Sequence, residues 1–164
     1  MTSTAFSSLP LSAEFLANLQ SLGYQTMTPV QAECLPVTLK GKDVQAQAKT
    51  GSGKTAAFGI GLLHKLNTKQ FQTQSLVLCP TRELADQVSK ELRRLARPVT
   101  NTKILTLCGG KPIGPQLASL EFKPHIVVGT PGRILKHLQK GSLKLHQLKT
   151  LVLDEADRML DMGF

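Results

Sequence analysis

Short, largely apolar runs alternate along the chain with longer stretches in which apolar residues recur every three or four positions. The short runs have the length and composition of buried β-strands. They are Asp43–Gln47, Ser75–Cys79, Lys103–Cys108, Ile126–Gly129 and Thr150–Asp154. Because mostly buried strands alternate with helical stretches, we expect an α/β fold in which a parallel sheet carries helices on both faces.

Two stretches show the helical period most clearly, and each follows one of the short runs. Their apolar faces are formed by Phe58, Leu62 and Leu66 in the first and by Leu84, Val88, Leu92 and Leu95 in the second. Two further helices are predicted to begin at Thr28-Pro29 and Thr130-Pro131, because threonine caps a helix and proline suits its first turn. No repeat or long linker interrupts the pattern, so one compact domain is expected.

At 164 residues the chain is long enough to bury a core. It has no apolar run of about 18 residues and no secretion-signal pattern at its start, so neither a membrane partner nor export is predicted. The cysteines are odd in number and lack CxxC spacing, which favours small buried side chains in a reducing, cytoplasmic setting. The histidines share no metal-ligand spacing and are expected in surface or packing roles. These residues are Cys34, Cys79 and Cys108, and His64, His125, His137 and His146.

The chain carries a net charge of +9, which favours a polyanionic partner such as nucleic acid. Aromatic residues make up only 4% of the chain, and there is no tryptophan, so a base-stacking platform is not expected. Any nucleic acid is therefore predicted to be held by its backbone.

A phosphate-binding loop is predicted between the first short run and the helix that follows it. Its glycines let the backbone curl around phosphate oxygens, its lysine reaches the terminal phosphates, and its last hydroxyl suits Mg²⁺. The loop residues are Ala48, Lys49, Thr50, Gly51, Ser52, Gly53, Lys54 and Thr55. The helix N-terminus that follows also attracts phosphate. A chance glycine-lysine turn is the alternative interpretation.

An acidic cluster follows the last apolar run. Asp154 is expected to hold Mg²⁺ through its water shell, together with Thr55, and Glu155 to orient or deprotonate the attacking water. A solvated strand end is the alternative. With the phosphate loop, these acids and Lys54 predict nucleoside-triphosphate hydrolysis. A GTPase is disfavoured because no Asn-Lys pair occurs, whereas a nucleotide kinase stays open at this point.

Residues 154–157 read Asp-Glu-Ala-Asp, and with the segments below they resemble the DEAD-box family of ATP-dependent RNA helicases over nearly the whole chain. Residues 23–31 are similar to the family's Q motif, with Phe6 at the upstream aromatic position. The resemblance implies that Gln31 reads the adenine edge, which an amide does with one donor and one acceptor, and that Tyr24 packs on the ring. It also implies ATP and Mg²⁺ as cofactors.

Three further segments are similar to the family's RNA-gripping motifs Ia, the glycine doublet and Ib. Each lies just past a predicted strand, and two lie at helix starts that attract phosphate. The residues are Pro80, Thr81 and Arg82; Gly109 and Gly110; and Thr130, Pro131, Gly132 and Arg133. Ordinary helix caps and turns are the alternative interpretation, most of all for the glycine doublet.

Within the family, three runs look closest to a bacterial subgroup linked to ribosomal RNA and large-subunit assembly. The resemblance predicts an N-terminal flank with the Q motif over residues 1–36 and a first RecA-like, ATP-binding domain over residues 37–164. It assigns Asp157 to coupling with a second RecA-like domain.

The Ser-Ala-Thr motif, the second RecA-like domain with its arginine fingers, and the subgroup's C-terminal RNA-binding domain are not found in the sequence. Because an arginine finger is worth roughly 10³–10⁵ in rate, we expect weak ATP binding and very slow hydrolysis by these residues alone. If the Ser-Ala-Thr strand normally lies between the phosphate-loop strand and the acidic-tetrad strand, two sheet edges are left unpaired and stability is predicted to be poor.

The leading hypothesis is the ATP-binding half of an RNA-dependent ATPase. Two alternatives remain: another phosphate-loop enzyme such as a nucleotide kinase, and a non-catalytic module that only clamps RNA.

Overall fold

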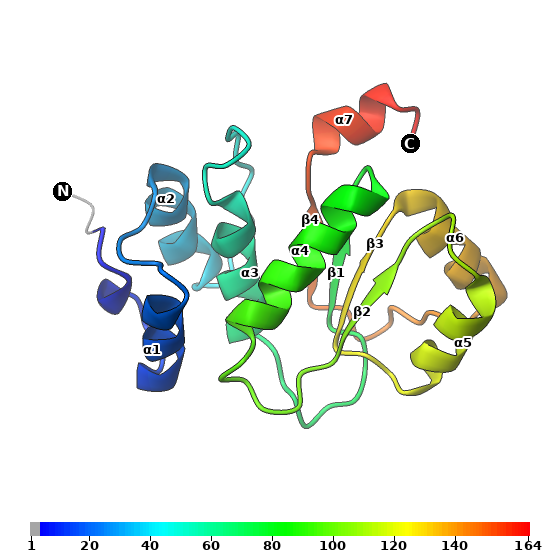
Figure 1. Ribbon diagram of the computed structural model, residues 1–164, viewed down its shortest axis with the longest axis horizontal. Helices are drawn as coiled ribbons and strands as arrows, with labels where there is room; N and C mark the ends of the chain where they lie inside the picture. Colours follow the sequence, from blue (N-terminus) through cyan, green and yellow to red (C-terminus); the bar gives the residue numbers. More distant parts are fainter. Residues whose placement is uncertain (1–3) are drawn as a thin grey trace. The chain divides into compact units, whose positions relative to one another are not determined.

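The computed structural model describes residues 4–164, which form two compact units (Figure 1). The first unit contains the residues up to Lys65 and the segment Glu91–Thr100. The second contains Leu66–Lys90 and Asn101–Phe164. The helix α4, Arg82–Leu95, contributes residues to both units.

A four-stranded parallel sheet forms the centre of the second unit, in the order β2-β3-β1-β4. Its strands are β1 Ser75–Leu78, β2 Ile104–Leu107, β3 Ile126–Gly129 and β4 Thr150–Leu153. β3 pairs with both β1 and β2 in register, so that Val127 lies level with Leu76 and Leu105. The sequence therefore predicted these four strands to within a residue or two.

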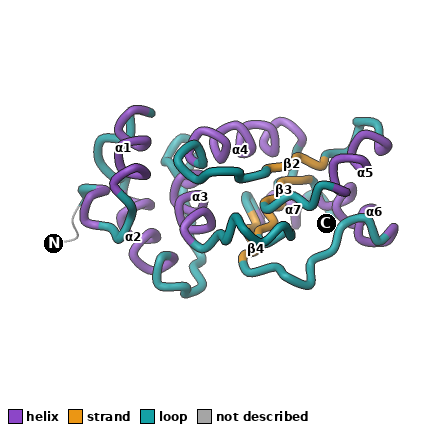
Figure 2. Tube along the Cα trace, turned by 90° about the horizontal axis from the view of Figure 1, so that it is seen from below, coloured by secondary structure: helices purple, strands orange, loops and turns teal. Residues whose placement is uncertain are grey.

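Helices cover both faces of this sheet, as the sequence predicted. On one face Leu76, Leu107 and Val127 pack against Leu120 of α5, Ile113–Glu121, and Ile134 of α6, Pro131–Lys140. On the other face the hydroxyl of Thr106 in β2 donates to Ser89 Oγ of α4 at 2.7 Å. Figure 2 shows the strands between α4 and α6. A short helix, α7, Ala156–Asp161, follows β4.

The first unit is helical. It contains a 3₁₀ turn at Phe6–Ser8 and the helices α1 Ala13–Ser21, α2 Pro29–Thr38 and α3 Lys54–His64. The end of α4 also belongs here, since a Cβ built on Gly59 of α3 would lie 2.9 Å from Leu92 Cδ2. The close approach of α3 and α4 depends on the missing side chain at position 59.

Three details of the predicted elements were wrong. Asp43–Gln47 does not form a strand. A strand needs a second strand to which it can hydrogen-bond, and the described part of the first unit contains no other strand. α3 ends at His64, so Leu66 lies outside it, and most of its side chains are buried rather than one face. Thr130 stands at the N-cap position of α6 but its side chain does not cap that helix.

Two further predictions were confirmed, namely the cap of α2 and the burial of the cysteines. Thr28 caps α2, because its hydroxyl accepts from Gln31 N, and Pro29 begins that helix. The thiols of Cys34, Cys79 and Cys108 are buried. Within residues 4–164 no helix has the length and apolar character needed to cross a membrane.

Candidate nucleotide-binding and RNA-binding sites

The predicted phosphate loop curls as its glycines require. Gly51 and Gly53 have φ angles of 82° and 84°, in the left-handed region that glycine adopts without strain. Ser52 N donates to Lys49 O at 3.1 Å, which closes the turn. α3 begins at Lys54 directly after Gly53, whose missing side chain leaves the helix start uncapped. This geometry is suited to an anion.

One hydroxyl of the loop supports that interpretation. Ser52 Oγ is buried, and no partner for it is found in the described part of the chain. A buried hydroxyl without a partner is costly, and a bound phosphate oxygen would satisfy it.

The Q motif and the phosphate loop are joined by Gln31. Its side chain is buried, with 1% of the residue exposed. Gln31 Oε1 accepts from Thr28 N at 3.0 Å, and Gln31 Nε2 donates to Gly53 O at 3.0 Å. The first bond completes a capping box at the start of α2. The amide that was predicted to read adenine is therefore already hydrogen-bonded to Thr28 and Gly53 within the protein.

The two aromatic residues assigned to the nucleotide contact one another. Phe6 is buried, and its ring meets that of Tyr24 edge-on, with 6.1 Å between the centroids. The Tyr24 hydroxyl donates to Glu91. Burial raises the pKa of Tyr24, and the hydrogen bond to Glu91 raises it further. Tyr24 therefore stays neutral and is fixed by two neighbours from its own unit.

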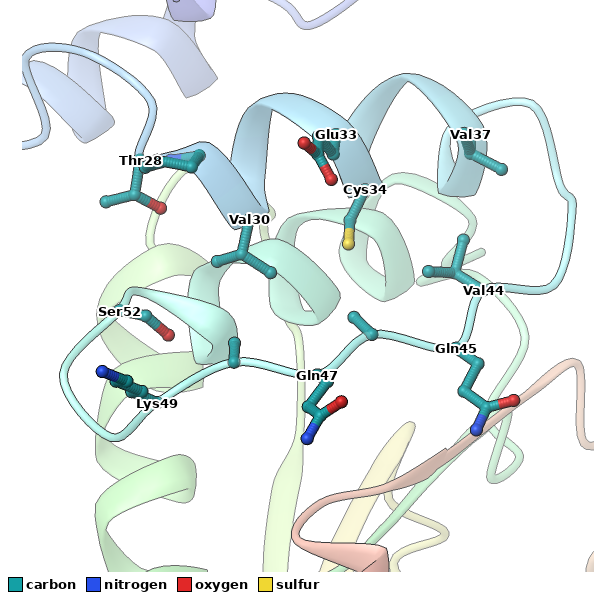
Figure 3. Close-up of a pocket in the computed structure, with 13 residues that line it drawn as sticks. Thr28, Val30, Glu33, Cys34, Val37, Val44, Gln45, Gln47, Lys49 and Ser52 are labelled. Carbon is teal, nitrogen blue, oxygen red and sulfur yellow. The ribbon is translucent and has the colours of Figure 1, made fainter.

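A cavity of about 660 Å³ lies between α2 and the segment that leads to the phosphate loop (Figure 3). Thr28, Lys49 and Ser52 lie toward one end of it, so that both nucleotide motifs contribute to its lining. Val44 points toward α2 whereas Gln47 points away, which is the alternation of a strand.

The acidic tetrad begins at the carboxyl end of β4, in the second unit. Asp154 is 5% exposed, and its N–H extends the sheet by donating to Leu78 O at 2.9 Å. Glu155 has a φ of 52°, a left-handed conformation that is strained for a residue with a side chain. Its carboxylate pairs with Arg158 at 3.3 Å. Asp157 is exposed in the first turn of α7.

The three segments that were predicted to grip RNA follow β1, β2 and β3 and meet at the carboxyl edge of the sheet. Gly109 N donates to Thr130 Oγ1 at 3.2 Å, which joins the glycine doublet to the start of α6. A Cβ built on Gly110, whose φ is 80°, would lie 3.3 Å from a guanidinium nitrogen of Arg82. The structure thus brings the residues of all three motifs together.

The remaining residues of these motifs are buried at the carboxyl edge of the sheet, begin a helix there, or form hydrogen bonds with neighbouring loops. Pro80 is buried, and the Thr81 hydroxyl caps α4 by accepting from Leu84 N at 3.2 Å. Gly132 is exposed, and Pro131 opens α6. Arg133 donates to the Lys111 carbonyl at 2.8 Å and to Gln116 Oε1 at 3.1 Å. Helix capping, the alternative interpretation, therefore holds for Thr81 but not for Thr130.

Sequence reasoning missed two residues of this edge. Gln116 of α5 is 7% exposed and His137 of α6 is fully buried, and their side chains are hydrogen-bonded at 2.8 Å. A single glutamine among apolar neighbours in 113–121 is the only signal that pointed to Gln116. His137 was expected in a packing or surface role, and it is buried.

Lys54 and Thr55 belong to the first unit, whereas Asp154 and Glu155 belong to the second. In the described residues no group of three or more histidine, cysteine or acidic side chains is arranged to hold a metal ion.

A family model described as DEAD/DEAH box helicase matches residues 28–164. The chain is 68% identical, over 98% of its length, to the ATP-dependent RNA helicase DbpA of Escherichia coli (strain K12). It is 48% identical, again over 98% of its length, to the DEAD-box ATP-dependent RNA helicase CshA of Geobacillus kaustophilus (strain HTA426). It spans only 35% and 34% of these two relatives.

Two solved structures are similar to the chain. A DEAD box protein from the hyperthermophile Methanococcus jannaschii matches with a TM-score of 0.92 and 43% identity, covering 98% of this chain and 44% of that one. A hypothetical ATP-dependent RNA helicase from Sulfolobus tokodaii matches with a TM-score of 0.84 and 38% identity, covering 94% of this chain and 44% of that one.

Proposed function

Because the chain belongs to the DEAD/DEAH box helicase family, we propose that it is the ATP-binding part of an RNA helicase, in which RNA-dependent ATP hydrolysis drives duplex unwinding. One observation carries the proposal. The three segments proposed to contact RNA follow β1, β2 and β3, and Asp154 follows β4, so the proposed RNA contacts and the proposed hydrolytic acids share the carboxyl edge of one sheet. Ligands of parallel sheets bind at this edge.

The nucleotide site is proposed to use the phosphate loop and the Q motif. Backbone N–H groups of residues 50–55 and the Ser52 hydroxyl hold phosphate oxygens, and Lys54 places its charge on the terminal phosphates. Gln31 has one amide N–H and one oxygen lone pair left beyond its two internal bonds, which suffice for an adenine edge. Phe6 and Tyr24 complete the adenine end.

Hydrolysis is assigned to the acidic tetrad. Glu155 is proposed to orient the attacking water and accept its proton. Thr55 and Asp154 would hold Mg²⁺, largely through water. The bound ion would supply positive charge for the phosphate oxygens. Asp157, exposed on α7, is proposed to contact a second RecA-like domain supplied by the same protein.

RNA is proposed to bind through its backbone at Arg82, Arg133 and the backbone groups of the glycine doublet. The net charge of +9 favours this polyanion, and the small aromatic content disfavours base stacking. From the resemblance of three sequence runs to a bacterial subgroup linked to ribosomal RNA, we propose a ribosomal RNA substrate, a role in ribosome biogenesis and a cytoplasmic location. Residues 1–36 are proposed as a flank and 37–164 as the first RecA-like domain.

The decisive test is ATP turnover by the full-length protein with and without RNA. We expect RNA to stimulate turnover of wild type, and Glu155→Gln to retain binding of ATP and RNA while losing turnover. Glu121→Gln, which removes an exposed carboxylate at the end of α5, is the control and should turn over normally. Unchanged turnover in Glu155→Gln would overturn the assignment, and RNA binding without any wild-type turnover would favour a non-catalytic clamp.

A further inference from the structure

A buried hydrogen-bond network lies directly beneath the proposed RNA-binding edge. His137 of α6 is fully buried, and its two ring nitrogens lie 2.8 Å from Gln116 Oε1 and 2.8 Å from Ser142 Oγ. Gln116 Nε2 donates to the Cys108 carbonyl at 3.1 Å, so its Oε1 is the acceptor. His137 Nε2 must therefore carry a proton and donate it to Gln116.

The oxygen of Gln116 has a second donor, which is Arg133. The guanidinium donates to Gln116 Oε1 at 3.1 Å and to the Lys111 carbonyl at 2.8 Å. An amide oxygen has two lone pairs, and these two donors occupy both. Two contacts fix the plane of the guanidinium, and one of them depends on the orientation that His137 imposes on the Gln116 amide.

The other end of Gln116 reaches the glycine doublet. Its amide nitrogen holds the carbonyl of Cys108, the residue directly before Gly109. Gly109 N in turn donates to Thr130 Oγ1. Through these bonds Gln116 is linked to the glycine doublet and to the start of α6, the two loops that are proposed to contact RNA.

His137 is suited to this role because it stays neutral. Burial lowers the pKa of His137, and the nearby charges of Arg133, Lys140 and Lys136 lower it further. A neutral ring with its proton on Nε2 donates to Gln116 without adding a buried charge beside Arg133.

We propose that His137, acting through Gln116, is a positioning residue for RNA binding that holds the Arg133 guanidinium and the glycine doublet in their RNA-contacting arrangement. This inference rests on the proposed contact of Arg133 with the RNA backbone. His137 itself touches neither RNA nor nucleotide.

The test is a double-mutant cycle on the affinity of the full-length protein for single-stranded RNA. Arg133→Ala should weaken RNA binding and lower the slope of log K against log salt by about 1. His137→Phe, which removes both ring hydrogen bonds, should weaken RNA binding by about threefold to tenfold. In the double variant His137→Phe should add less to Arg133→Ala than its own effect in wild type, because part of that effect passes through Arg133 and only the part that passes through the glycine doublet remains.

A second buried histidine provides the matched control. His125 is also fully buried, accepts from Lys103 N at 3.0 Å, and lies 3.0 Å from the Thr68 carbonyl, but it precedes β3 at the opposite edge of the sheet. His125→Phe should lower stability without changing RNA affinity. His137→Gln, which retains a donor for Gln116, should restore part of the RNA affinity. ATP affinity is measured in every variant and should stay constant.

The outcomes are separable. If Arg133→Ala leaves RNA affinity unchanged, the proposed RNA contact fails and this inference fails with it. If Arg133→Ala weakens binding but the effects of the two substitutions multiply, only the positioning role is overturned. An equal loss of RNA affinity in His125→Phe, or a parallel loss of ATP affinity in His137→Phe, would also overturn it, since either result indicates general destabilisation.

Discussion

Gln31 Nε2 donates a hydrogen bond to the carbonyl oxygen of Gly53 at 3.0 Å, so one side chain of α2 holds the last turn of the phosphate loop. The same carbonyl accepts from Ala57 N in the first turn of α3. The Q motif therefore supports the phosphate-binding backbone in addition to its proposed contact with adenine. This relationship can be tested separately from nucleotide recognition.

Gln31→Glu tests the support that Gln31 gives to the phosphate loop, because stability is measured without nucleotide. The glutamate retains an oxygen for Thr28 N but loses the donor to Gly53 and places a carboxylate against a carbonyl oxygen. We expect stability to fall by about 1–3 kcal/mol, since the Gly53 carbonyl loses one of its two donors and faces a buried carboxylate instead, and ATP affinity to fall with it. Denaturant unfolding and ATP titration provide the measurements. Thr38→Val is a control, because among the described residues its hydroxyl bonds only to a carbonyl within α2. Equal losses there would count against a specific role for Gln31.

Gly53→Ala should damage the loop more than Gly51→Ala. Both glycines have left-handed backbones, so each alanine carries strain of about 1–2 kcal/mol. Only at position 53 would the new Cβ crowd Gln31, at 3.2 Å from its Cδ, and Thr28 Oγ1, also at 3.2 Å. We expect Gly53→Ala to cost about 1–3 kcal/mol more in the free energy of unfolding. Equal costs for the two variants would refute the close contact with Gln31.

Glu155→Gly should stabilise the protein while it abolishes ATP turnover. A φ of 52° raises the free energy of a residue with a side chain more than that of glycine. The ion pair with Arg158, which the variant loses, contributes little to stability because Arg158 is exposed. We expect a gain of about 0.5–1 kcal/mol. Lys123 has the same φ of 52°, and Lys123→Gly should give a similar gain with normal turnover. A fall in stability for Glu155→Gly alone would show that its backbone is not strained.

Stability should fall as the pH is lowered below about 6.5. Burial lowers the pKa of His125 and of His137 in the folded state, whereas in the unfolded chain both titrate near 6.5. The unfolded state therefore binds more protons in acid, and its free energy falls relative to the folded state. Urea unfolding at pH 7.5 and 5.5 measures the effect. Each histidine-to-phenylalanine variant should show a smaller drop between these two pH values, and an identical drop would exclude that histidine as a contributor.

Local spacing explains why so much of the nucleotide motif could be predicted. A threonine followed at three positions by glutamine and at one by proline specifies a capped helix start through contacts within one turn. The structure shows that cap at Thr28 and Gln31. Loop glycines are equally local, because a positive φ is a property of a single residue. These features depend on few distant atoms.

The wrong predictions depend on distant partners. Residues 43–47 alternate as a strand does, but pairing is decided by a neighbouring strand, which their unit lacks in the described residues. Thr130 is placed to cap α6, yet its hydroxyl accepts a hydrogen bond from Gly109 N of another loop instead of from the helix. Gln116 and His137 were missed for the same reason, since a polar residue on a helix gains its role only when the fold supplies its partners.

Both acceptors that hold Arg133 are uncharged: a main-chain carbonyl at Lys111 and an amide oxygen at Gln116. A carboxylate in either position would orient the guanidinium equally well but would cancel its charge. Arg82, by contrast, lies 4.0 Å from the carboxylate of Glu83. The Arg133 guanidinium is therefore held in a fixed orientation at the edge of the sheet by neutral acceptors that do not offset its positive charge. Within the described residues no carboxylate pairs with Arg133, so an arriving RNA strand would have no counter-ion to displace there.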